Sequence, residues 1–280
     1  MNNNRAIPKL YGVIGSPLGH SLSPILHTTA FRALDLPGVL LPWPVSPEQL
    51  PDFVKAIRLL DIRGVAVTIP HKQAIMPLLD GISDTAKKVG AVNLVYRDGD
   101  RLLGDNTDIL GFTLPLADPP LPPDTPVLLL GAGGATRGVI AGLHVLGMTN
   151  IHISNRTAAT AADMAAEFGL QTVDWSRRGE IMAGLVVNTT PLGMKGKFEE
   201  ETPYPGEWLA GCAGIAYDIV YTPVKTRFIR EAEAAGWRTL TGLDMFIGQA
   251  DQQFLTWTGQ HLPDVARQVV VDALMKDTSK

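Results

Sequence analysis

The sequence predicts an α/β protein built from two domains. Short apolar runs, such as residues 10–15, 64–69 and 127–130, alternate with segments of helical periodicity. The length of 280 residues fits one large domain or two ordinary ones. A stretch with four prolines, residues 118–124, interrupts the pattern, and prolines stiffen a linker and prevent regular pairing. We therefore expect the domain boundary there.

The composition is that of a globular chain. Apolar residues make up 45% and charged residues 19%, which allows a sizeable core. The formal net charge of −4 gives no reason to expect nucleic acid or an anionic membrane as a partner. The single cysteine, Cys212, excludes an internal disulfide and a cysteine-rich zinc site. The first residues lack the apolar core of a signal peptide, and no run is long enough to span a bilayer, so we expect a soluble, cytoplasmic protein.

Residues 127–138 carry the strongest local pattern. An apolar strand meets a glycine cluster, and a helical pattern follows. Gly131 and Gly133 fit the first two glycines of the dinucleotide-binding fingerprint, whereas Thr136 occupies the third position. A helix start presents unpaired N–H groups and a partial positive charge, which favour a pyrophosphate. The alternative is an ordinary strand-to-helix turn.

The next predicted strand, residues 151–154, is followed by Asn155, Arg156 and Thr157. A site specific for NAD usually has an acidic residue here, which accepts a hydrogen bond from the ribose 2′-hydroxyl. Here an arginine stands in its place, and a guanidinium matches a 2′-phosphate in charge and geometry. The position favours NADP over NAD, although Arg156 can also be read as a solvated loop charge.

A loop with two serines follows the first predicted strand. Ser23 before Pro24 is typical of a helix N-cap, so Ser23 has a structural interpretation, whereas Ser21 has no such duty. Two hydroxyls beside a helix start can together hold a ligand carboxylate. We expect His20 and His27 to be structural rather than catalytic.

Three further side chains stand at predicted element ends. Lys72 follows the strand 64–69, which is a suitable place for chemistry in an open α/β sheet, although a solvated surface lysine is the alternative. Asn93 is a poor strand former, so its amide should have a partner, either backbone or ligand. Asp108 is either a helix N-cap or a carboxylate that faces the lysine. A hairpin is expected around residues 98–100.

Six motifs in order carry a family resemblance. They are Ser-Leu-Ser-Pro at 21–24, Val-Thr-Ile-Pro-His-Lys at 67–72, Gly-Ala-Val-Asn at 90–93, Asp-Asn-Thr-Asp at 105–108, Gly-Ala-Gly-Gly-Ala at 131–135 and Asn-Arg-Thr at 155–157. Together they closely resemble the shikimate dehydrogenase family, and the resemblance covers nearly the whole chain.

The resemblance implies a role for each matching residue. Lys72 and Asp108 would form the catalytic pair. Residues that would hold the substrate are Ser21, Ser23, Thr68, Asn93, Tyr217 and Gln249. Residues that would hold NADP are Gly131, Ala132, Gly133, Gly134, Ala135, Asn155, Arg156, Thr157, Thr189 and Gly242. Tyr217 can equally be a core tyrosine, and the loop 188–194 an ordinary polar loop. In the last long helix, Phe246, Ala250, Phe254 and Trp257 share a core face, and Gln249 lies off it.

The resemblance also implies the architecture. A substrate domain, residues 1–117 and 241–280, would be interrupted by a Rossmann-like NADP-binding domain, residues 118–240, and the C-terminal helices would return to the first domain. A cleft between hinged domains would close on the substrate. Two departures are notable: Ala66 stands where the family usually has asparagine in the substrate pocket, and Ile109 replaces a frequent glycine.

The implied reaction is the reversible NADPH-linked reduction of 3-dehydroshikimate to shikimate, a step towards chorismate and the aromatic amino acids. Negative charge that develops on the ring carbonyl oxygen needs a proton or a positive charge, and a lysine ammonium supplies both. The cofactor carries the hydride, so no metal is needed. The alternatives are a paralogue acting on quinate or an aminated analogue, which Ala66 keeps open, and a catalytically silent NADP-binding sensor. The resemblance leaves monomer or homodimer open.

Overall fold

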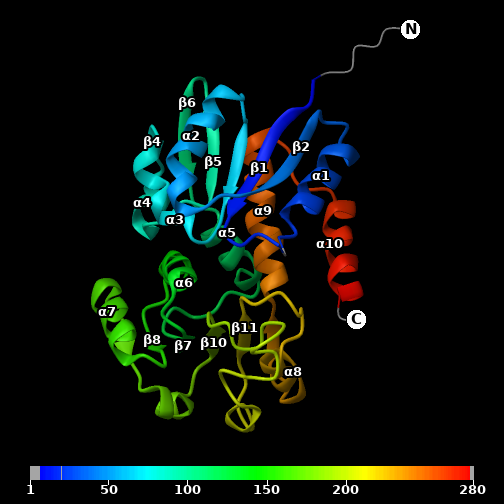
Figure 1. Cartoon of the computed structure of the whole chain (residues 1–280). Helices are drawn as coiled ribbons and strands as arrows, with labels where there is room; N and C mark the ends of the chain where they lie inside the picture. The colour runs from blue at the N-terminus through cyan, green and yellow to red at the C-terminus, as the bar shows by residue number, and fades with distance from the viewer. Residues whose placement is uncertain (1–6, 20, 278–280) are drawn as a thin grey trace. The chain divides into compact units, whose positions relative to one another are not determined.

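The computed structural model describes residues 7–19 and 21–277, with side chains to residue 274. Contacts divide the chain into two compact units: the first unit comprises residues 1–107 and 249–280, and the second unit residues 108–248. The chain thus returns to the first unit through α9 (Gly242–Thr258) and α10 (Asp264–Asp277), as predicted (orange and red in Figure 1). Of the helices described, none combines the length and apolar character needed to cross a bilayer.

The first unit is built on a mixed sheet with the strand order β2-β1-β3-β5-β6-β4 (Figure 1). Its strands are β1 (Lys9–Gly15), β2 (Gly38–Pro44), β3 (Gly64–Val67), β4 (Gly81–Ile82), β5 (Leu94–Asp98) and β6 (Arg101–Asp105). β1 pairs in parallel with β2 and β3, whereas β5 is antiparallel to β3 and β6. Because β1 and β3 are parallel neighbours, the loops that follow them leave the same edge of the sheet.

One face of this sheet is covered by amphipathic helix. The helices of the first part of the chain are α1 (Ser23–Ala33), α2 (Leu50–Leu59), α3 (His71–Ala74) and α4 (Asp84–Val89), with short 3₁₀ turns η1 (Pro47–Gln49) and η2 (Met76–Leu78). In α2, Leu50, Val54 and Ile57 are buried and Leu59 is exposed, which is the spacing of an amphipathic helix. They pack with Val65 and neighbouring strand residues into one core cluster.

The other face of β3 is covered by α9. A Cβ on Gly64 would lie only 2.1 Å from Nε1 of Trp257, so the glycine allows the indole to lie against the strand. The same Nε1 donates a hydrogen bond of 3.1 Å to the carbonyl of Val95. Phe254 is fully buried one turn earlier. The predicted core face of this helix is thus confirmed at the residues that belong to the first unit.

His27 is buried within this aromatic packing. Its ring lies 5.9 Å from the Phe254 ring and 5.2 Å from the Trp257 ring, between centroids. Burial lowers the pKa of His27 to about 3, because the interior disfavours the charged imidazolium. The residue is therefore a neutral core histidine, in agreement with the structural role expected for it. His20 lies outside the described residues.

The predicted hairpin is confirmed. β5 and β6 pair antiparallel, and Asp98 faces Arg101 across a two-residue loop. Gly99 has φ +59°, a left-handed conformation that glycine adopts at no steric cost. The strand itself starts at Leu94, so Asn93 lies just outside it.

The second unit contains a six-stranded sheet in the order β12-β11-β10-β7-β8-β9 (Figure 1). Its strands are β7 (Val127–Leu130), β8 (Ile151–Ser154), β9 (Gln171–Thr172), β10 (Leu185–Asn188), β11 (Ile215–Asp218) and β12 (Arg238–Leu240). Every pairing in this sheet is parallel. Counted along the chain, the order is 3-2-1-4-5-6, the Rossmann arrangement. The order reverses between β7 and β10, and the carboxyl ends of strands at such a switch point are where these sheets bind dinucleotides.

The helices of the second unit are α5 (Asp108–Thr113), α6 (Gly134–Val145), α7 (Ala158–Phe168) and α8 (Arg227–Ala234), with 3₁₀ turns η3 (Leu114–Leu116), η4 (Trp175–Glu180) and η5 (Gly206–Trp208). β7 is buried on both faces, which explains its uninterrupted apolar sequence. Val127 and Leu129 belong to one core cluster, and Leu128 and Leu130 to another. Each fully buried leucine contributes about 1.5–3 kcal/mol.

The contacts divide the chain at 107/108 and 248/249 rather than at the predicted 117/118 and 240/241. The first difference arises because α5 packs on α6, and Phe112 joins the core of the second unit. The proline-rich stretch is also fastened to the second unit: Arg238 donates to the carbonyl of Asp118, and the carbonyl of Pro123 accepts from the N–H of Thr149. Residues 118–124 are therefore a loop of this unit rather than a free linker.

Candidate active site

The glycines of the turn after β7 are explained by two different physical requirements. Gly131 has φ +110°, and a Cβ there would lie 2.7 Å from Oγ1 of Thr189. This glycine is therefore required by the backbone itself. A Cβ on Gly133 or Gly134 would meet nothing within 4 Å. Their bare backbone faces open space at the N-terminus of the 12-residue helix α6, where a pyrophosphate fits.

Thr136, at the third position of the fingerprint, is fully buried and fastens the turn. Its hydroxyl accepts from the N–H of Gly133 at 3.1 Å and lies 2.8 Å from the hydroxyl of Thr189. Thr189 in turn donates to the carbonyl of Leu130 at 2.9 Å. A glycine at this position would allow the helix to pack closely on the strand. The threonine instead forms hydrogen bonds that join the ends of β7 and β10. The imperfect match to the fingerprint thus has a structural explanation.

The Asn-Arg-Thr segment directly follows β8, the parallel neighbour of β7. The N–H of Gly131 donates to the carbonyl of Ser154 at 2.8 Å, which ties the two strand ends together. Asn155 donates its side-chain amide to the carbonyl of Thr157 at 3.0 Å, and Arg156 is exposed. Arg156 therefore follows its strand at the same edge of the sheet as the glycine turn.

The serine loop differs from the prediction in one respect. The helix α1 starts at Ser23 itself, and the cap position falls on Leu22. Ser21 supplies the hydroxyl that accepts from the N–H of Ser23, at 3.4 Å. The expected N-cap role of Ser23 is therefore wrong, because Ser23 and Pro24 are both within the first helical turn, where proline is tolerated. Ser23 is nearly buried, and Ser21 is half-buried.

The lysine loop is held to both neighbouring strands. Thr68 donates its N–H to the carbonyl of Ile14 at the end of β1, and its own carbonyl accepts from the N–H of His71. Lys72 is half-buried in the short helix α3, and its carbonyl accepts from the N–H of Val92 at 2.7 Å. The loops that carry the serines and the lysine thus leave one sheet edge, as the parallel pairing of β1 and β3 requires.

Asn93 is buried, and its side chain has protein partners. Its Oδ1 accepts from the backbone N–H of Thr107 at 2.7 Å, and its Nδ2 donates to the hydroxyl of Thr107 at 3.0 Å. Its carbonyl accepts from the N–H of Val67 at 2.8 Å. The sequence leaves either backbone or a ligand as the partner of the Asn93 amide. The structure shows a backbone partner, the N–H of Thr107 in the following loop.

Gln249 and Gln253 form a pair on α9 that the sequence analysis missed in part. Gln253 is buried, and its Nε2 donates to Oε1 of Gln249 at 2.8 Å and to the carbonyl of Asn93 at 3.2 Å. It therefore joins two of the predicted substrate residues. The spacing of four residues between the glutamines, which places both on one side of a helix, was the available signal.

Asp108 is the first residue of α5 and is half-buried in the second unit. A Cβ on Gly138 of α6 would lie 3.5 Å from the Cβ of Asp108. The two helices therefore pack closely where the carboxylate starts. Ile109, which replaces a frequent glycine of the family, is buried at the next position.

Tyr217 is a core residue, which corrects its predicted role. It is fully buried on β11, and its ring stacks on Phe112 with centroids 4.9 Å apart. Burial raises the pKa of its hydroxyl, and the charge of Asp244 raises it further. A second tyrosine, Tyr221, follows in the sequence Asp-Ile-Val-Tyr-Thr-Pro at 218–223. Tyr221 is half-buried beyond the strand end and stacks on Phe246.

A buried polar network supports the carboxyl edge of the second sheet. Asp218 accepts hydrogen bonds from Asn188 at 2.9 Å and from the N–H of Val220 at 2.9 Å, and lies 2.6 Å from the hydroxyl of Thr226. Burial raises the pKa of Asp218 to about 7, although these hydrogen bonds act in the opposite direction. Asn188 also binds the hydroxyl of Thr190. The network fixes the loop that starts at Thr189.

Gly242 has a packing reason to be glycine. A Cβ at this position would lie 2.3 Å from the carbonyl oxygen of Ile219. The start of α9 therefore rests directly on the backbone that follows β11. This close approach accounts for the glycine without a ligand.

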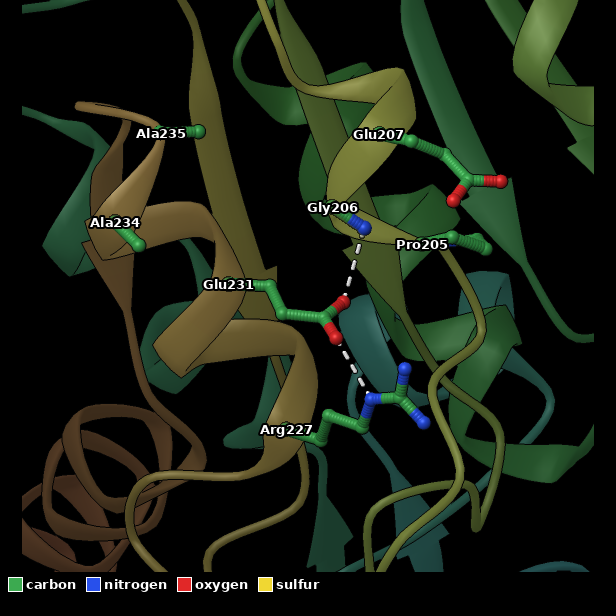
Figure 2. Close-up of a pocket in the computed structure, with 7 residues that line it drawn as sticks. All are labelled: Pro205, Gly206, Glu207, Arg227, Glu231, Ala234 and Ala235. Atoms are coloured by element: carbon green, nitrogen blue, oxygen red, sulfur yellow. Dashed lines mark hydrogen bonds and ion pairs between the residues drawn. The ribbon is translucent and has the colours of Figure 1, made fainter.

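The surface hollow in Figure 2 contains none of the predicted residues. It has a volume of about 410 Å³ and lies along η5 and α8. Glu231 projects into it, and its two oxygens accept from the N–H of Gly206 at 2.9 Å and from Nε of Arg227 at 2.7 Å. These contacts give Glu231 a structural role in joining η5 to α8.

Comparisons with known proteins agree with this geometry. The family model described as the shikimate dehydrogenase substrate binding domain matches residues 13–95. A shikimate dehydrogenase (NADP(+)) from Pelobacter propionicus is 62% identical over 97% of this chain and 99% of its own length. The structure of shikimate 5-dehydrogenase from Thermus thermophilus in complex with NADP(H) and shikimate superposes with a TM-score of 0.85 and 38% identity, over 95% of this chain and 99% of the other.

A related activity occurs among the structural neighbours. Quinate dehydrogenase from Corynebacterium glutamicum, in complex with NAD, has a TM-score of 0.87 and 29% identity, over 95% of this chain and 99% of the other. Identity with the Pelobacter protein is twice as high and extends over almost the full length of both chains. On the strength of that full-length identity, the chain belongs to the shikimate dehydrogenase family.

Proposed function

We propose that this protein is an NADP-dependent shikimate dehydrogenase that reversibly reduces 3-dehydroshikimate to shikimate. The observation that carries this proposal is the full-length identity of 62% to a shikimate dehydrogenase (NADP(+)). The residues that would form the site support it: Lys72 lies in α3, Asn93 directly precedes β5, and Asp108 is the first residue of α5. This intact set argues against a silent NADP-binding sensor.

The second unit would bind NADP. The open space over Gly133 and Gly134 at the start of α6 suits the pyrophosphate, and Gly131, Ala132 and Ala135 complete the turn. Asn155, Arg156 and Thr157 would contact the ribose 2′-phosphate, to which an exposed guanidinium offers charge and paired donors. Thr189 would face the cofactor from the end of β10. Bound NADPH supplies the hydride.

The first unit would bind the ring acid. Ser21 and Ser23 stand at the N-terminus of α1, where a carboxylate gains hydroxyl donors and the helix dipole. Thr68, Asn93 and Gln249 would contact the ring. Of the two tyrosines at 217 and 221, which both belong to the second unit, Tyr221 is the one whose partial exposure allows contact with a ligand.

Lys72 and Asp108 would form the catalytic pair that transfers the proton. During reduction, the Lys72 ammonium donates a proton to the ring carbonyl oxygen, on which negative charge develops. During oxidation, the neutral amine accepts the proton of the ring hydroxyl. The Asp108 carboxylate would be the second member of this pair, as the family resemblance implies. We further propose a cytoplasmic enzyme that acts as a monomer or homodimer, a choice that light scattering on the purified protein decides.

The test is turnover followed at the absorbance band of reduced nicotinamide. Purified protein is supplied with shikimate or quinate, each with NADP or NAD, beside the Lys72→Ala variant. Fast turnover of shikimate with NADP that is lost in the variant supports the proposal. Preference for quinate or NAD would instead make it a paralogue, with buried Ala66 as the first residue to exchange for asparagine. Tight NADP binding without turnover of either acid would revive the sensor.

A further inference from the structure

We infer that Gln253 is a positioning residue for the ring acid: it holds the side-chain amide of Gln249 so that the NH₂ end of Gln249 faces the substrate. This inference rests on the proposed function and adds a residue and a chemical specificity to it. Gln253 would not touch the substrate itself. It would act through Gln249.

The contacts of Gln253 form a chain of two hydrogen bonds. Its Nε2 donates to the backbone carbonyl of Asn93 at 3.2 Å and to Oε1 of Gln249 at 2.8 Å. Gln253 is 2% exposed, so both bonds are shielded from water. Its Oε1 is buried without a hydrogen-bond partner among the described residues. Both donor hydrogens of this amide are thus committed to Asn93 and Gln249.

The backbone determines the direction of both amides. A carbonyl oxygen can only accept, so the end of Gln253 that faces Asn93 must be its NH₂. The carbonyl of Asn93 is oriented by a second donor, the N–H of Val67 at 2.8 Å. The same NH₂ of Gln253 faces Gln249, so that end of Gln249 must be its oxygen. The NH₂ of Gln249 therefore points away from Gln253.

The register of α9 on the sheet places Gln249 near the lysine loop. Trp257 donates to the carbonyl of Val95, and Gln253 donates to the carbonyl of Asn93. The two donors are four residues apart on the helix, and the two carbonyls are two residues apart on the strand side. Four helical residues rise about 6 Å and two strand residues about 6.6 Å, so the register holds along the strand. Because the carbonyl of Asn93 is paired with the N–H of Val67, Gln253 stands level with the end of β3, and Gln249, one turn earlier, lies towards the loop that follows β3.

This orientation has a chemical consequence. A donor from Gln249 selects a ring acid that carries an acceptor oxygen, a hydroxyl or carboxylate, at the facing position. An analogue without that oxygen would lack this hydrogen bond. Asn93 is oriented in a similar manner, since the N–H of Thr107 fixes its Oδ1. Backbone groups thus determine which end of each amide is presented.

The experiment measures shikimate affinity by titration calorimetry in a double-mutant cycle. Gln253→Met keeps the buried volume and removes both donors. We expect the shikimate Kd to rise about three- to tenfold, the factor for one lost hydrogen bond, with the NADP Kd unchanged. In a Gln249→Ala background the same change should alter the shikimate Kd by less than about twofold, because the residue through which it acts is gone.

Gln252→Met is the matched control, since it makes the same exchange on the neighbouring, half-buried residue of α9. It should leave both affinities within about twofold. An equal rise of the shikimate Kd for Gln253→Met in both backgrounds would overturn the inference, because a merely structural role does not depend on Gln249. Failure of wild-type turnover counts against the proposed function, whereas this cycle judges Gln253 from binding alone. Gln253→Glu, which keeps the shape but opposes the Asn93 carbonyl, should weaken shikimate binding further.

Discussion

The two units place polar groups at their sheet edges by different means. In the second unit the backbone conformation is decisive: Gly131 requires its positive φ, and Gly133 and Gly134 leave the backbone at the start of α6 uncovered by side chains. In the first unit, side chains bind groups of distant segments, as in the bond from Nε2 of Gln253 to the backbone carbonyl of Asn93, 160 positions away. A backbone site is visible in a short stretch of sequence, whereas a side-chain site becomes visible only after folding.

The largest expected effect concerns the chemistry attributed to the first unit. Lys72→Ala should lower kcat for shikimate oxidation by about 10²- to 10⁴-fold, the range for removal of a general acid–base. The NADP Kd should stay unchanged, since the second unit would bind the cofactor. Stopped-flow absorbance and calorimetry measure the two quantities. Lys87→Ala, at an exposed lysine paired with Asp84, serves as the control. Near-normal kcat in Lys72→Ala would remove this lysine from the mechanism.

The second unit also has a buried side-chain network, around Asp218, and its contribution to the free energy of unfolding depends on pH. The pKa of Asp218 is raised to about 7 in the fold from 3.8. The folded protein therefore keeps a proton that the unfolded chain releases, and the free energy of unfolding falls as pH rises from about 4 to 7. Three pH units correspond to about 4 kcal/mol.

Asp218→Asn should remove this slope, because its amide can face Thr226 as the protonated acid would. Urea unfolding of both proteins between pH 4.5 and 8 measures the difference. Parallel curves for the two proteins would mean that Asp218 is ionised throughout.

The two glycine functions in the turn can be separated. Gly131→Ala should lower the free energy of unfolding by about 1–3 kcal/mol, because of its positive φ and the contact with Thr189. Gly133→Ala, at φ −93°, should leave stability within about 0.5 kcal/mol. Its methyl group should nevertheless weaken NADP binding about tenfold by occupying the approach to the pyrophosphate. Thermal unfolding and calorimetry distinguish these results, and equal effects of both variants on stability would refute the distinction.

The smallest effect is expected from Arg156, which is exposed and therefore screened. Arg156→Glu should shift the ratio of NADP to NAD affinity about tenfold towards NAD, since the loss is that of a charge-assisted contact. Arg230→Glu on α8, also exposed, is the control. An unchanged ratio would return Arg156 to the status of a solvated loop charge.

The fold could be predicted from the sequence where a local residue pattern has a single structural interpretation. The glycine turn, the hairpin at Gly99 and the return of the C-terminal helices all follow from local pattern or from motif order. The N-cap role expected of Ser23 is wrong, and Tyr217 is a core residue, because the environment of each depends on its neighbours in the fold. Whether Ser23 or Leu22 occupies the cap depends on where the first helical turn closes. Whether Tyr217 or Tyr221 is accessible depends on where β11 ends.

The sequence by itself determined the Rossmann-type turn, the NADP preference expected of Arg156 and the family, because each depends on residues close together in the chain or on their order. The tertiary structure decided which amide ends face outwards. Gln253, and through it Gln249, is oriented by the backbone carbonyl of Asn93, which only folding brings within 3.2 Å. The side chain of Asn93 is oriented by the backbone N–H of Thr107. A side-chain amide has two nearly identical ends, and its neighbours, not its position in the sequence, determine which end donates.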